Sequence, residues 1–279
     1  ATRFFLCLSP LGGRPPIHQT AGHMMTPTIA FNMANLVAYY SDFQFKLSEW
    51  GKQHQLAADR TTAEEWKRIC ERIRDVGYDA VEVWVALVEK CEADPSLAAE
   101  FKRTLAANRL KPVALAGPLN DRNAIVCQRL GIPMTAGGWW GSDKETAARV
   151  SRATGILVNY ENHPEKSVQE IREQANFGAD GFAVALDTGW LGTQRVDAPK
   201  AVRELGRLIR HVHLKDVIAP GGHETCRLGD GVVDIPGVID ELKKVGYDGV
   251  LSWEDEPENR DIFEIAAEMR EYIAREWSK

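Results

Sequence analysis

The chain has 279 residues, of which 44% are hydrophobic and 27% charged, and its formal net charge at pH 7 is -6. This length fits one large domain and is enough to bury a substantial core. The negative net charge gives no sign of a nucleic-acid surface, and no apolar run comes near the roughly 20 residues needed to span a bilayer. We therefore expect neither nucleic acid nor a membrane as a partner.

The beginning of the chain differs from the rest. Residues 1–24 are rich in Gly and Pro and lead to the pair Met24 and Met25, so we expect an N-terminal extension or expression remnant, followed by one domain over 25–279. The run FFLCL is too short for the apolar core of a signal peptide. The five cysteines are scattered and show no CxxC spacing, which is typical of reduced thiols and favours a cytoplasmic location.

From residue 27 onward, predicted strands and helices alternate. Apolar runs predict strands at 27–33, 79–87, 111–117, 131–137, 155–160, 181–187, 209–216 and 247–254. Amphipathic segments predict a helix after each strand, at 62–77, 96–110, 120–131, 142–155, 167–178, 197–208, 235–246 and 261–276. Two helix starts carry capping signals: Thr61 and Thr62 before Glu64 and Glu65 in the first, and Ser142 before Glu145 in the fourth.

Eight strand–helix pairs in about 250 residues predict a single α/β domain, a (β/α)8 TIM barrel with eight parallel strands. An open, doubly wound sheet is the structural alternative, but it would usually carry a glycine-rich loop after the first strand, and IAFNMANL is no such loop. Residues 39–60 form the longest irregular insertion. Because they follow the first strand, we expect them to cover the mouth of the barrel.

The functional face of such a barrel lies at the carboxyl ends of the strands. Four consecutive predicted strands each carry, at or near the carboxyl end, a polar side chain that is able to bind a metal: Glu161, Asp187, His213 and Glu254. A single acid at a strand end is most often a loop residue or a helix cap, and Asp187 in DTG is also a plausible turn former. Their coincidence at four neighbouring strands favours one shared site.

The residues around this set are interpreted separately. His211 and His213 are two apart on one strand, so both point to the same side; His213 is the better placed ligand and His211 is expected to be structural. Asp255 and Glu256 follow Glu254 in a run of charges, which favours a solvated loop.

Three carboxylates and an imidazole at one barrel mouth would repel one another unless a cation neutralised them. This oxygen-rich set suits one divalent ion, with Mn²⁺ as the first expectation, Mg²⁺ and Co²⁺ as close alternatives, and Zn²⁺ as a further one. With coordination positions left open, the ion would polarise a carbonyl and its neighbouring hydroxyl.

Four segments resemble the xylose isomerase-like TIM-barrel superfamily of sugar isomerases and epimerases: YENHPE, ALDTGW, HVHLKD and LGDGVVDIPGVIDELKKVGYDGVLSWEDEPE. That superfamily also includes inosose dehydratases, hydroxypyruvate isomerases and endonuclease IV. The likeness is strong from about residue 155 to residue 258 and mainly architectural before that. In ketose 3-epimerase-like members, a Glu, Asp, His, Glu quartet binds one divalent metal, and its two glutamates are also the acid/base pair. The resemblance implies that the quartet in this chain is Glu161, Asp187, His213 and Glu254, with Glu161 and Glu254 as the acid/base pair.

The sequence departs from the epimerase pattern at two positions. Trp190 stands where those enzymes have a histidine, three residues after the metal-binding Asp, and Ala219 stands where they have an arginine, six residues after the metal-binding His. Both residues touch substrate in those relatives, which argues against a tagatose-type 3-epimerase. The chain has seven histidines, too few at the strand ends for the three-metal site of endonuclease IV, so DNA repair is not expected.

The shared chemistry is removal of a proton next to a carbonyl, followed by its return. Return to the same carbon gives epimerisation, return to the neighbouring carbon gives isomerisation, and loss of a β oxygen gives elimination. The first hypothesis is therefore a metal-dependent sugar isomerase or epimerase. The second is a lyase on a keto-sugar, either an inosose-type dehydratase or a 3-keto-glycoside eliminase. The third is a non-catalytic sugar-binding barrel, against which the intact pair Glu161 and Glu254 argues.

Several further residues are candidates for contact with a carbohydrate substrate. Tryptophans after strand ends serve either sugar stacking or packing. Asn162 and His163 would bind hydroxyls or orient Glu161, Lys215 would stabilise an oxyanion or, the favoured reading, pair with Asp216, and Arg227 would hold an anionic group. The tryptophans that follow or lie near strand ends, and are therefore candidates for stacking on a sugar, are Trp84, Trp139, Trp140 and Trp190. No glycine-rich phosphate loop is evident, which favours a free sugar, and a homo-oligomer is an open expectation.

Overall fold

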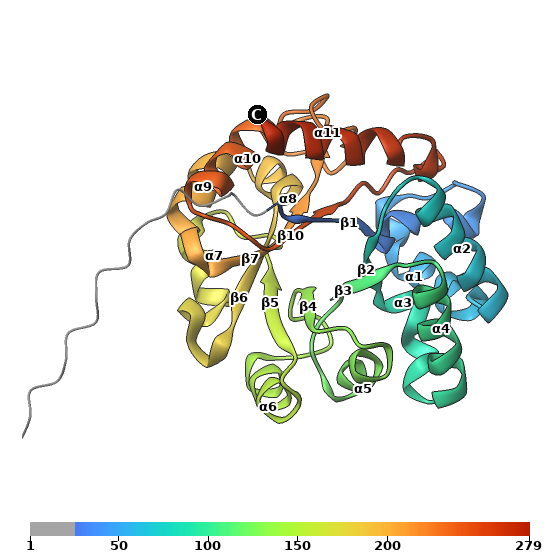
Figure 1. The fold of residues 1–279 in the computed structure, drawn as a ribbon. Coiled ribbons are helices and arrows are strands. Elements are labelled where there is room, and N and C mark those ends of the chain that lie inside the picture. Colours follow the sequence, from blue (N-terminus) through green and yellow to red (C-terminus); the bar gives the residue numbers. More distant parts are fainter. Residues whose placement is uncertain (1–25) are drawn as a thin grey trace, which may run out of the picture.

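The computed structural model describes residues 26–279, so the predicted extension at 1–24 and the boundary at Met25 lie outside the described residues. Within this range, parallel strands close into a barrel in the order β1-β10-β7-β6-β5-β4-β3-β2, with helices around it (Figure 1). The predicted (β/α)8 barrel is confirmed. The barrel strands are β1 (Thr28–Asn32), β2 (Ala80–Trp84), β3 (Lys111–Ala116), β4 (Met134–Gly137), β5 (Leu157–Glu161), β6 (Ala183–Asp187), β7 (Ile209–Leu214) and β10 (Val250–Trp253).

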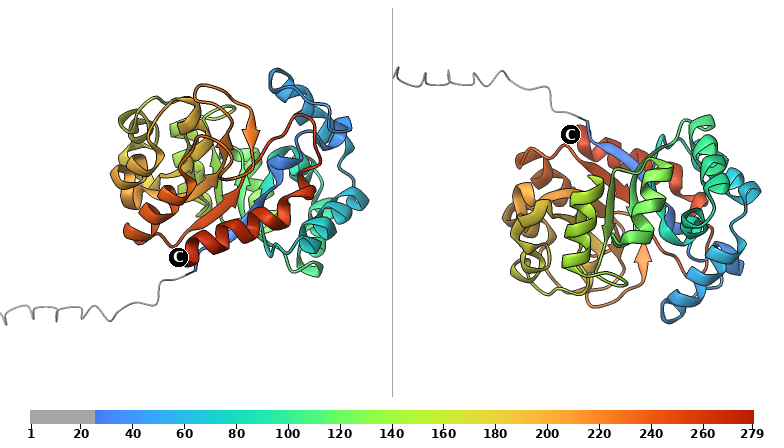
Figure 2. Two further views of the ribbon diagram at one scale, coloured as in Figure 1. Left: turned by 90° about the horizontal axis from the view of Figure 1, so that it is seen from above. Right: turned by 90° about the horizontal axis from the view of Figure 1, so that it is seen from below.

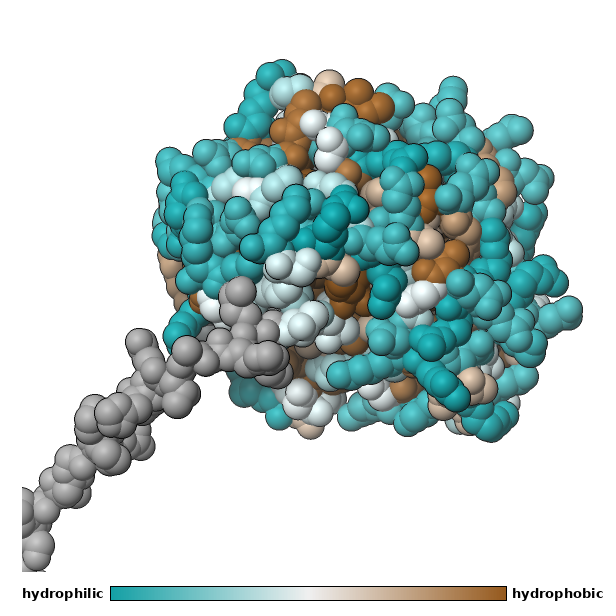
Figure 3. All heavy atoms as spheres, turned by 45° about the horizontal axis from the view of Figure 1, so that its top comes forward, coloured by the Kyte–Doolittle hydropathy of each residue, from teal (hydrophilic) through white to brown (hydrophobic). Residues whose placement is uncertain are grey.

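The outer layer follows the predicted alternation. Its helices are α2 (Ala63–Asp75), α4 (Pro95–Ala107), α5 (Asp121–Leu130), α6 (Lys144–Thr154), α7 (Val168–Gln174), α9 (Ala198–Leu205), α10 (Ile235–Lys244) and α11 (Ala266–Ser278). Shorter helices include α1 (Trp50–Arg60), α3 (Val85–Val88) and α8 (Thr188–Thr193). The face in Figure 3 is mainly hydrophilic, with scattered hydrophobic residues, because these amphipathic helices turn their apolar stripes toward the strands.

One helix start was predicted correctly and one was not. Of the two predicted candidates, Thr61 and Thr62, the structure has Thr62 as the cap of α2: its side chain accepts a hydrogen bond from the Glu65 N–H. The cap of α6 is Asp143, whose carboxylate accepts from the Thr146 N–H, so the prediction of Ser142 is wrong. The Ser142 hydroxyl instead donates to the Leu119 carbonyl at 2.6 Å.

The strands alternate between two surroundings, as the period of two requires. Phe31 and Trp253, which are register partners, belong to the main core between strands and helices, whereas Ala30 and Val250 on the same two strands belong to a small separate cluster with Ala80 and Val113. The same alternation brings polar residues such as Ser252 opposite His213 on adjacent strands. Inward positions are therefore small or polar, which leaves room for buried charged groups.

The segment after β1 is helical rather than irregular, which corrects the prediction for residues 39–60. It contains short 3-10 helices at Met33–Leu36, Tyr39–Ser41 and Leu47–Glu49, followed by α1. Both views in Figure 2 place this segment at the same end of the barrel as the hairpin formed by β8 (Asp216–Val217) and β9 (Thr225–Cys226). That end also holds the carboxyl ends of the strands, so the insertion does border the mouth. None of the helices in residues 26–279 combines the length and apolar character that a membrane crossing requires.

Candidate metal centre and active-site cavity

Four side chains from neighbouring strand ends meet at the mouth of the barrel. Glu161 ends β5, Asp187 ends β6, His213 is the second-last residue of β7, and Glu254 directly follows β10. One ligand atom from each of the four lies within 4.8 Å of the others, and all four residues are buried. We call this set the candidate metal cluster. The structure brings together the four residues that the sequence analysis selected, and their binding of a metal remains a prediction.

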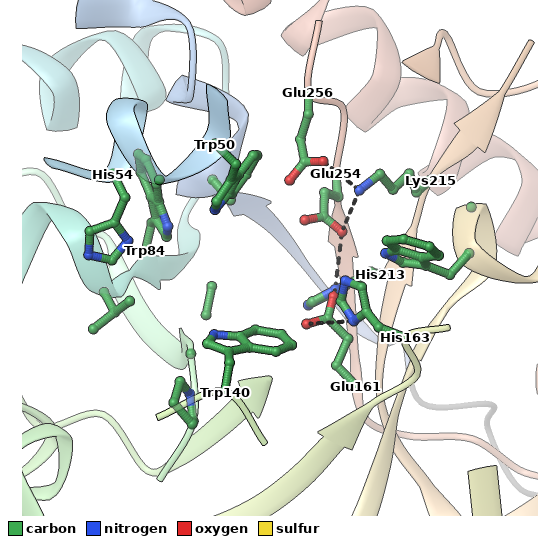
Figure 4. A pocket seen from close by; sticks show the side chains of 18 of the residues that line it. Trp50, His54, Trp84, Trp140, Glu161, His163, His213, Lys215, Glu254 and Glu256 are labelled. Atoms are coloured by element: carbon green, nitrogen blue, oxygen red, sulfur yellow. Dashed lines mark hydrogen bonds and ion pairs between the residues drawn. The ribbon is translucent and has the colours of Figure 1, made fainter. Parts of the chain in front are cut away.

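His213 contacts both Glu161 and Glu254 (Figure 4), and both of its ring nitrogens face carboxylates. Its Nδ1 lies 2.8 Å from the Glu161 Oε1 and 3.1 Å from the Glu254 Oε2. Its Nε2 lies 3.0 Å from the Oε1 of Glu82, a buried acid on β2. If the Nε2–H donates to Glu82, Nδ1 is left facing two carboxylates, which is the arrangement of a histidine that binds a metal through Nδ1.

Glu82 is a candidate functional residue that the sequence did not reveal. Its second oxygen, Oε2, lies 2.8 Å from the Nε2 of His211, so one fully buried carboxylate joins both histidines of β7. Burial alone would raise the pKa of Glu82, but His211 and His213 lower it well below its usual range. The sequence feature that could have revealed Glu82 is an acidic residue in the middle of the otherwise apolar strand AVEVW, where burial in the barrel gives no reason for a carboxylate. His211 has the structural position predicted for it.

The charges of the cluster fit a divalent cation. The buried Asp187 Oδ2 has no hydrogen-bond partner among residues 26–279, and the buried Glu254 Oε2 has only ion-pair contacts, with the His213 Nδ1 and the Lys215 Nζ. Burial raises the pKa of Asp187 to about 6, even though Lys215 nearby lowers it. Burial also disfavours charged His213, yet Glu82, Glu254 and Glu161 raise its pKa well above the usual value. Three acids therefore demand positive charge near Nδ1, and an oxygen-rich set with one imidazole suits a divalent ion.

Lys215 borders the cluster but does not pair with Asp216, which corrects the favoured reading. Its Nζ lies 2.7 Å from the Glu256 Oε2, and 3.8 Å from both the Asp187 Oδ2 and the Glu254 Oε2. Asp216 instead accepts hydrogen bonds from the backbone N–H groups of Gly229, Gly231 and Val233. Its short side chain therefore holds the loop after β9, while the longer Lys215 reaches the mouth.

Asp255 is buried and Glu256 is largely shielded from solvent, so the prediction of a solvated loop was wrong. Asp255 is fully buried, where it accepts hydrogen bonds from the Thr225 hydroxyl at 2.7 Å and from Arg260 at 2.5 Å. The side chain of Glu256 is only 11% exposed. Burial raises the pKa of Glu256 to about 8, despite the opposing effect of Lys215. For each acid at least one polar partner is distant in the sequence: Thr225 is 30 residues from Asp255, and Lys215 is 41 residues from Glu256.

Asn162 and His163 have different surroundings. The Asn162 amide donates to the Asp187 carbonyl at 3.0 Å and accepts from the Asp187 N–H at 2.8 Å, so it joins the end of β5 to the end of β6. His163 lines the cavity, and its Nδ1 lies 3.9 Å from the Glu161 Oε2. Its ring packs between Trp140 and Trp190, with centroid distances of 5.2 and 4.5 Å.

The candidate metal cluster opens into a cavity of about 660 Å³. Trp50, His54 and Trp84 stand across this cavity from Glu161 and Glu254, and Trp140 lies between the two sides (Figure 4). The insertion after β1 contributes Trp50 and His54, so it forms part of the wall, as its position predicted.

Three predicted substrate contacts are not among the described residues that line this cavity: Asn162, Trp139 and Arg227. Trp139 instead packs on Tyr160, with ring centroids 5.3 Å apart. Arg227 forms ion pairs with Glu268 and Asp230 and borders a separate depression. Adjacent tryptophans thus have opposite surroundings, because Trp139 turns toward the core and Trp140 toward the cavity.

The sequence profile of the family described as xylose isomerase-like TIM barrel matches residues 70–275. An inosose dehydratase from Geobacillus thermodenitrificans is 29% identical over 141 residues, which cover 43% of this chain and 47% of that enzyme. The chain thus aligns with about half the length of this curated relative.

Solved structures share the fold. L-ribulose 3-epimerase superposes with a TM-score of 0.65 at 16% identity, covering 91% of this chain and 95% of that one. The IolI protein with a bound zinc atom superposes with a TM-score of 0.62 at 17% identity, covering 90% of this chain and 98% of that one. These likenesses show the same barrel along most of both chains.

Proposed function

We propose, because the chain belongs to the xylose isomerase-like TIM-barrel family, that it is a divalent-metal-dependent isomerase or epimerase of a free sugar. The observation that carries this proposal is the candidate metal cluster, in which four ligand atoms from four strand ends lie within 4.8 Å of one another beside a cavity. Members of this family include sugar epimerases and dehydratases, so an enzyme is the expected class.

The residues that would hold the ion are Glu161, Asp187, His213 and Glu254. When bound, a divalent cation polarises a substrate carbonyl with its neighbouring hydroxyl and stabilises an enediolate, which is worth several kcal/mol. Mn²⁺ is our first choice for this set of oxygens, and Zn²⁺ is a competing choice because a zinc atom is present in the IolI protein.

Glu161 and Glu254 are the proposed acid/base pair. They come from β5 and β10, with β6 and β7 between them in the barrel, and both approach the Nδ1 of His213. Each also lines the cavity. One glutamate would take the proton from the carbon next to the carbonyl, and the other would return a proton to that carbon or to its neighbour. Lys215 would balance the negative charge of Glu254 during the transfer.

Elimination is the second candidate function, and two observations favour it. The inosose dehydratase that aligns with this chain does so over 47% of its own length. In addition, Trp190 lines the cavity at the position where the epimerase pattern has a histidine. In this reaction one glutamate would take the same proton, and the other would protonate the departing β oxygen. The two candidates share their first step and differ in what leaves.

The test is incubation of the metal-loaded protein with a panel of free ketoses, aldoses and inososes in D2O, followed by NMR. Deuterium at the carbon next to the carbonyl, without a change of formula, identifies an isomerase or epimerase. Loss of water or of an aglycone identifies a lyase. Neither exchange nor turnover across the panel, with metal bound, would contradict both and leave a non-catalytic sugar-binding barrel.

A pair of variants connects the result to the acid/base residues. Glu254→Gln is expected to slow exchange by about 10²–10⁴-fold, the usual contribution of one general acid or base. The matched control is Glu264→Gln, which changes an exposed glutamate outside the cavity and is expected to exchange at the wild-type rate. Exchange at the wild-type rate in Glu254→Gln would remove Glu254 from this role.

A further inference from the structure

The cavity has two unlike sides. On one side are charged residues, including Glu161, Lys215 and Glu254. Opposite them are Trp50, His54 and Trp84, and Trp140 lies between the two sides; we call these four residues the aromatic wall. Figure 4 shows the first three across the open space from the charged side, with the Trp140 ring between them and His163. The proton-transfer chemistry uses only the charged side and does not explain the aromatic wall.

Most of the aromatic wall is held rigidly by its neighbours. Trp84, at the end of β2, is only 3% exposed, and its ring packs against Trp50 and His54 with centroid distances of 5.8 Å in both cases. Trp50 also packs against Phe45, at 5.9 Å. The His54 Nε2 lies 3.3 Å from the Glu89 Oε2. A surface fixed in this way loses little conformational entropy when a ligand stacks on it.

Trp140 provides the accessible ring of the wall. Trp140 borders the cavity and is 52% exposed. A Cβ added to Gly138 would lie 2.0 Å from the Trp140 ring, so glycine at 138 allows the ring to lie against the backbone. A large, half-exposed aromatic surface facing a cavity is typical of a surface that a ligand covers.

The volume also exceeds what a free sugar at the candidate metal cluster would need. A cavity of about 660 Å³ lies in the range that holds drug-sized ligands, about 300–1,000 Å³. Glu89, Glu92 and Arg122 line the cavity as well, so the far rim is polar. The part of a ligand against the wall is therefore expected to be flat and apolar on its faces, with a hydrated outer edge.

We propose that the aromatic wall is a subsite for an aromatic group, so that the substrate is a keto-sugar joined to an aryl group, an aryl keto-glycoside, which fits the elimination candidate with the aryl group on the departing β oxygen. The sugar part would meet the candidate metal cluster, while the aryl group would stack on Trp140 and pack against Trp50. This inference rests on the proposed function in its elimination form, and only for the position of the sugar and for its keto group. The stacking itself depends on the wall alone.

The test compares two probes by isothermal titration calorimetry on the metal-loaded protein: 4-nitrophenyl β-D-glucoside and methyl β-D-glucoside. The aryl glucoside is expected to bind about 10–100-fold more tightly, the range that stacking of a flat ring on aromatic side chains provides. Trp140→Ala and Trp50→Leu are each expected to remove most of this preference. Phe177→Ala, which changes a residue that is 61% exposed and outside the cavity, is expected to keep it.

The outcomes separate this inference from the proposed function. Equal affinities for the two probes in the wild type, or no measurable binding of the aryl glucoside, would overturn it. An equal loss of affinity for both probes in Trp140→Ala would show that the wall binds the sugar ring, which also overturns it. Circular dichroism melting of each variant verifies folding. Glu254→Gln should keep the aryl preference, so a failed acid/base proposal leaves this result readable.

Discussion

The two sides of the cavity come from different halves of the barrel and are built by different forces. The charged side comes from β5, β6, β7 and β10, and hydrogen bonds and ion pairs between strands fix its side chains. The aromatic wall comes from α1, β2 and the loop after β4, and ring packing fixes it. Reaction chemistry and recognition are thus expected to occupy separate sets of residues, so that each set can be changed without the other.

Asp187→Asn should produce the largest effect on the charged side. Asparagine keeps an acceptor for the Trp190 N–H, which caps α8, but it removes one of the three carboxylate charges. We expect the affinity for Mn²⁺ to fall by more than about 100-fold, which is above the range for outer partners of metal ligands. Calorimetric titration of the metal-free protein measures this. A change of less than threefold would show that Asp187 is not a ligand.

Glu82→Gln should weaken metal binding by about 10–100-fold, because Glu82 orients the His213 ring without being a proposed ligand. Glutamine keeps one acceptor oxygen but replaces the other with an NH2 group, so either His211 or His213 loses its acceptor. We also expect stability to fall by about 1–3 kcal/mol in urea unfolding. A purely structural role for Glu82 would lower stability while leaving the metal affinity of the folded protein unchanged.

Trp140→Ala should separate the two sides most clearly. The Trp140 ring packs against His163 and not against His213 of the candidate metal cluster. We therefore expect Mn²⁺ affinity to stay within about twofold of the wild type, as for independent sites. Calorimetric titration with Mn²⁺ measures this. A loss of metal affinity as large as that of Glu82→Gln would mean that the two sides are one coupled unit.

Arg227→Ala should have the smallest effect. Its guanidinium pairs with Glu268 on the outside of the cavity, and exposed pairs contribute little. We expect stability to change by no more than about 0.5 kcal/mol and turnover to stay unchanged, as measured by urea unfolding and by NMR. A selective rise in KM for an anionic substrate would restore the predicted anion-binding role of Arg227.

The sequence predicted the barrel and the positions of the four strand-end residues because both depend on local patterns. Apolar runs alternating with amphipathic segments give the fold, and the carboxyl ends of parallel strands must meet at one face. The position of Glu161, Asp187, His213 and Glu254 follows from these two facts. Their chemical role rests on the resemblance and on the charge argument, and is still a prediction.

Contacts between distant residues could not be predicted in this way. Asp255 appeared solvated because it lies in a charged run, but Thr225 and Arg260 hydrogen-bond it inside the protein. The contact between Glu82 and His211 could not be predicted from local patterns, because the two residues are 129 positions apart in the sequence. Trp139 and Trp140 are neighbours in sequence, and only the path of the loop after β4 decides which of them faces the cavity.

The central claim is that one divalent ion binds among Glu161, Asp187, His213 and Glu254. A crystal structure of the Mn²⁺-loaded protein, with diffraction recorded at the manganese absorption edge, tests it most directly. The account predicts a single strong anomalous peak within coordination distance of all four side chains. A peak at another place, or none in crystals saturated with Mn²⁺, would contradict it.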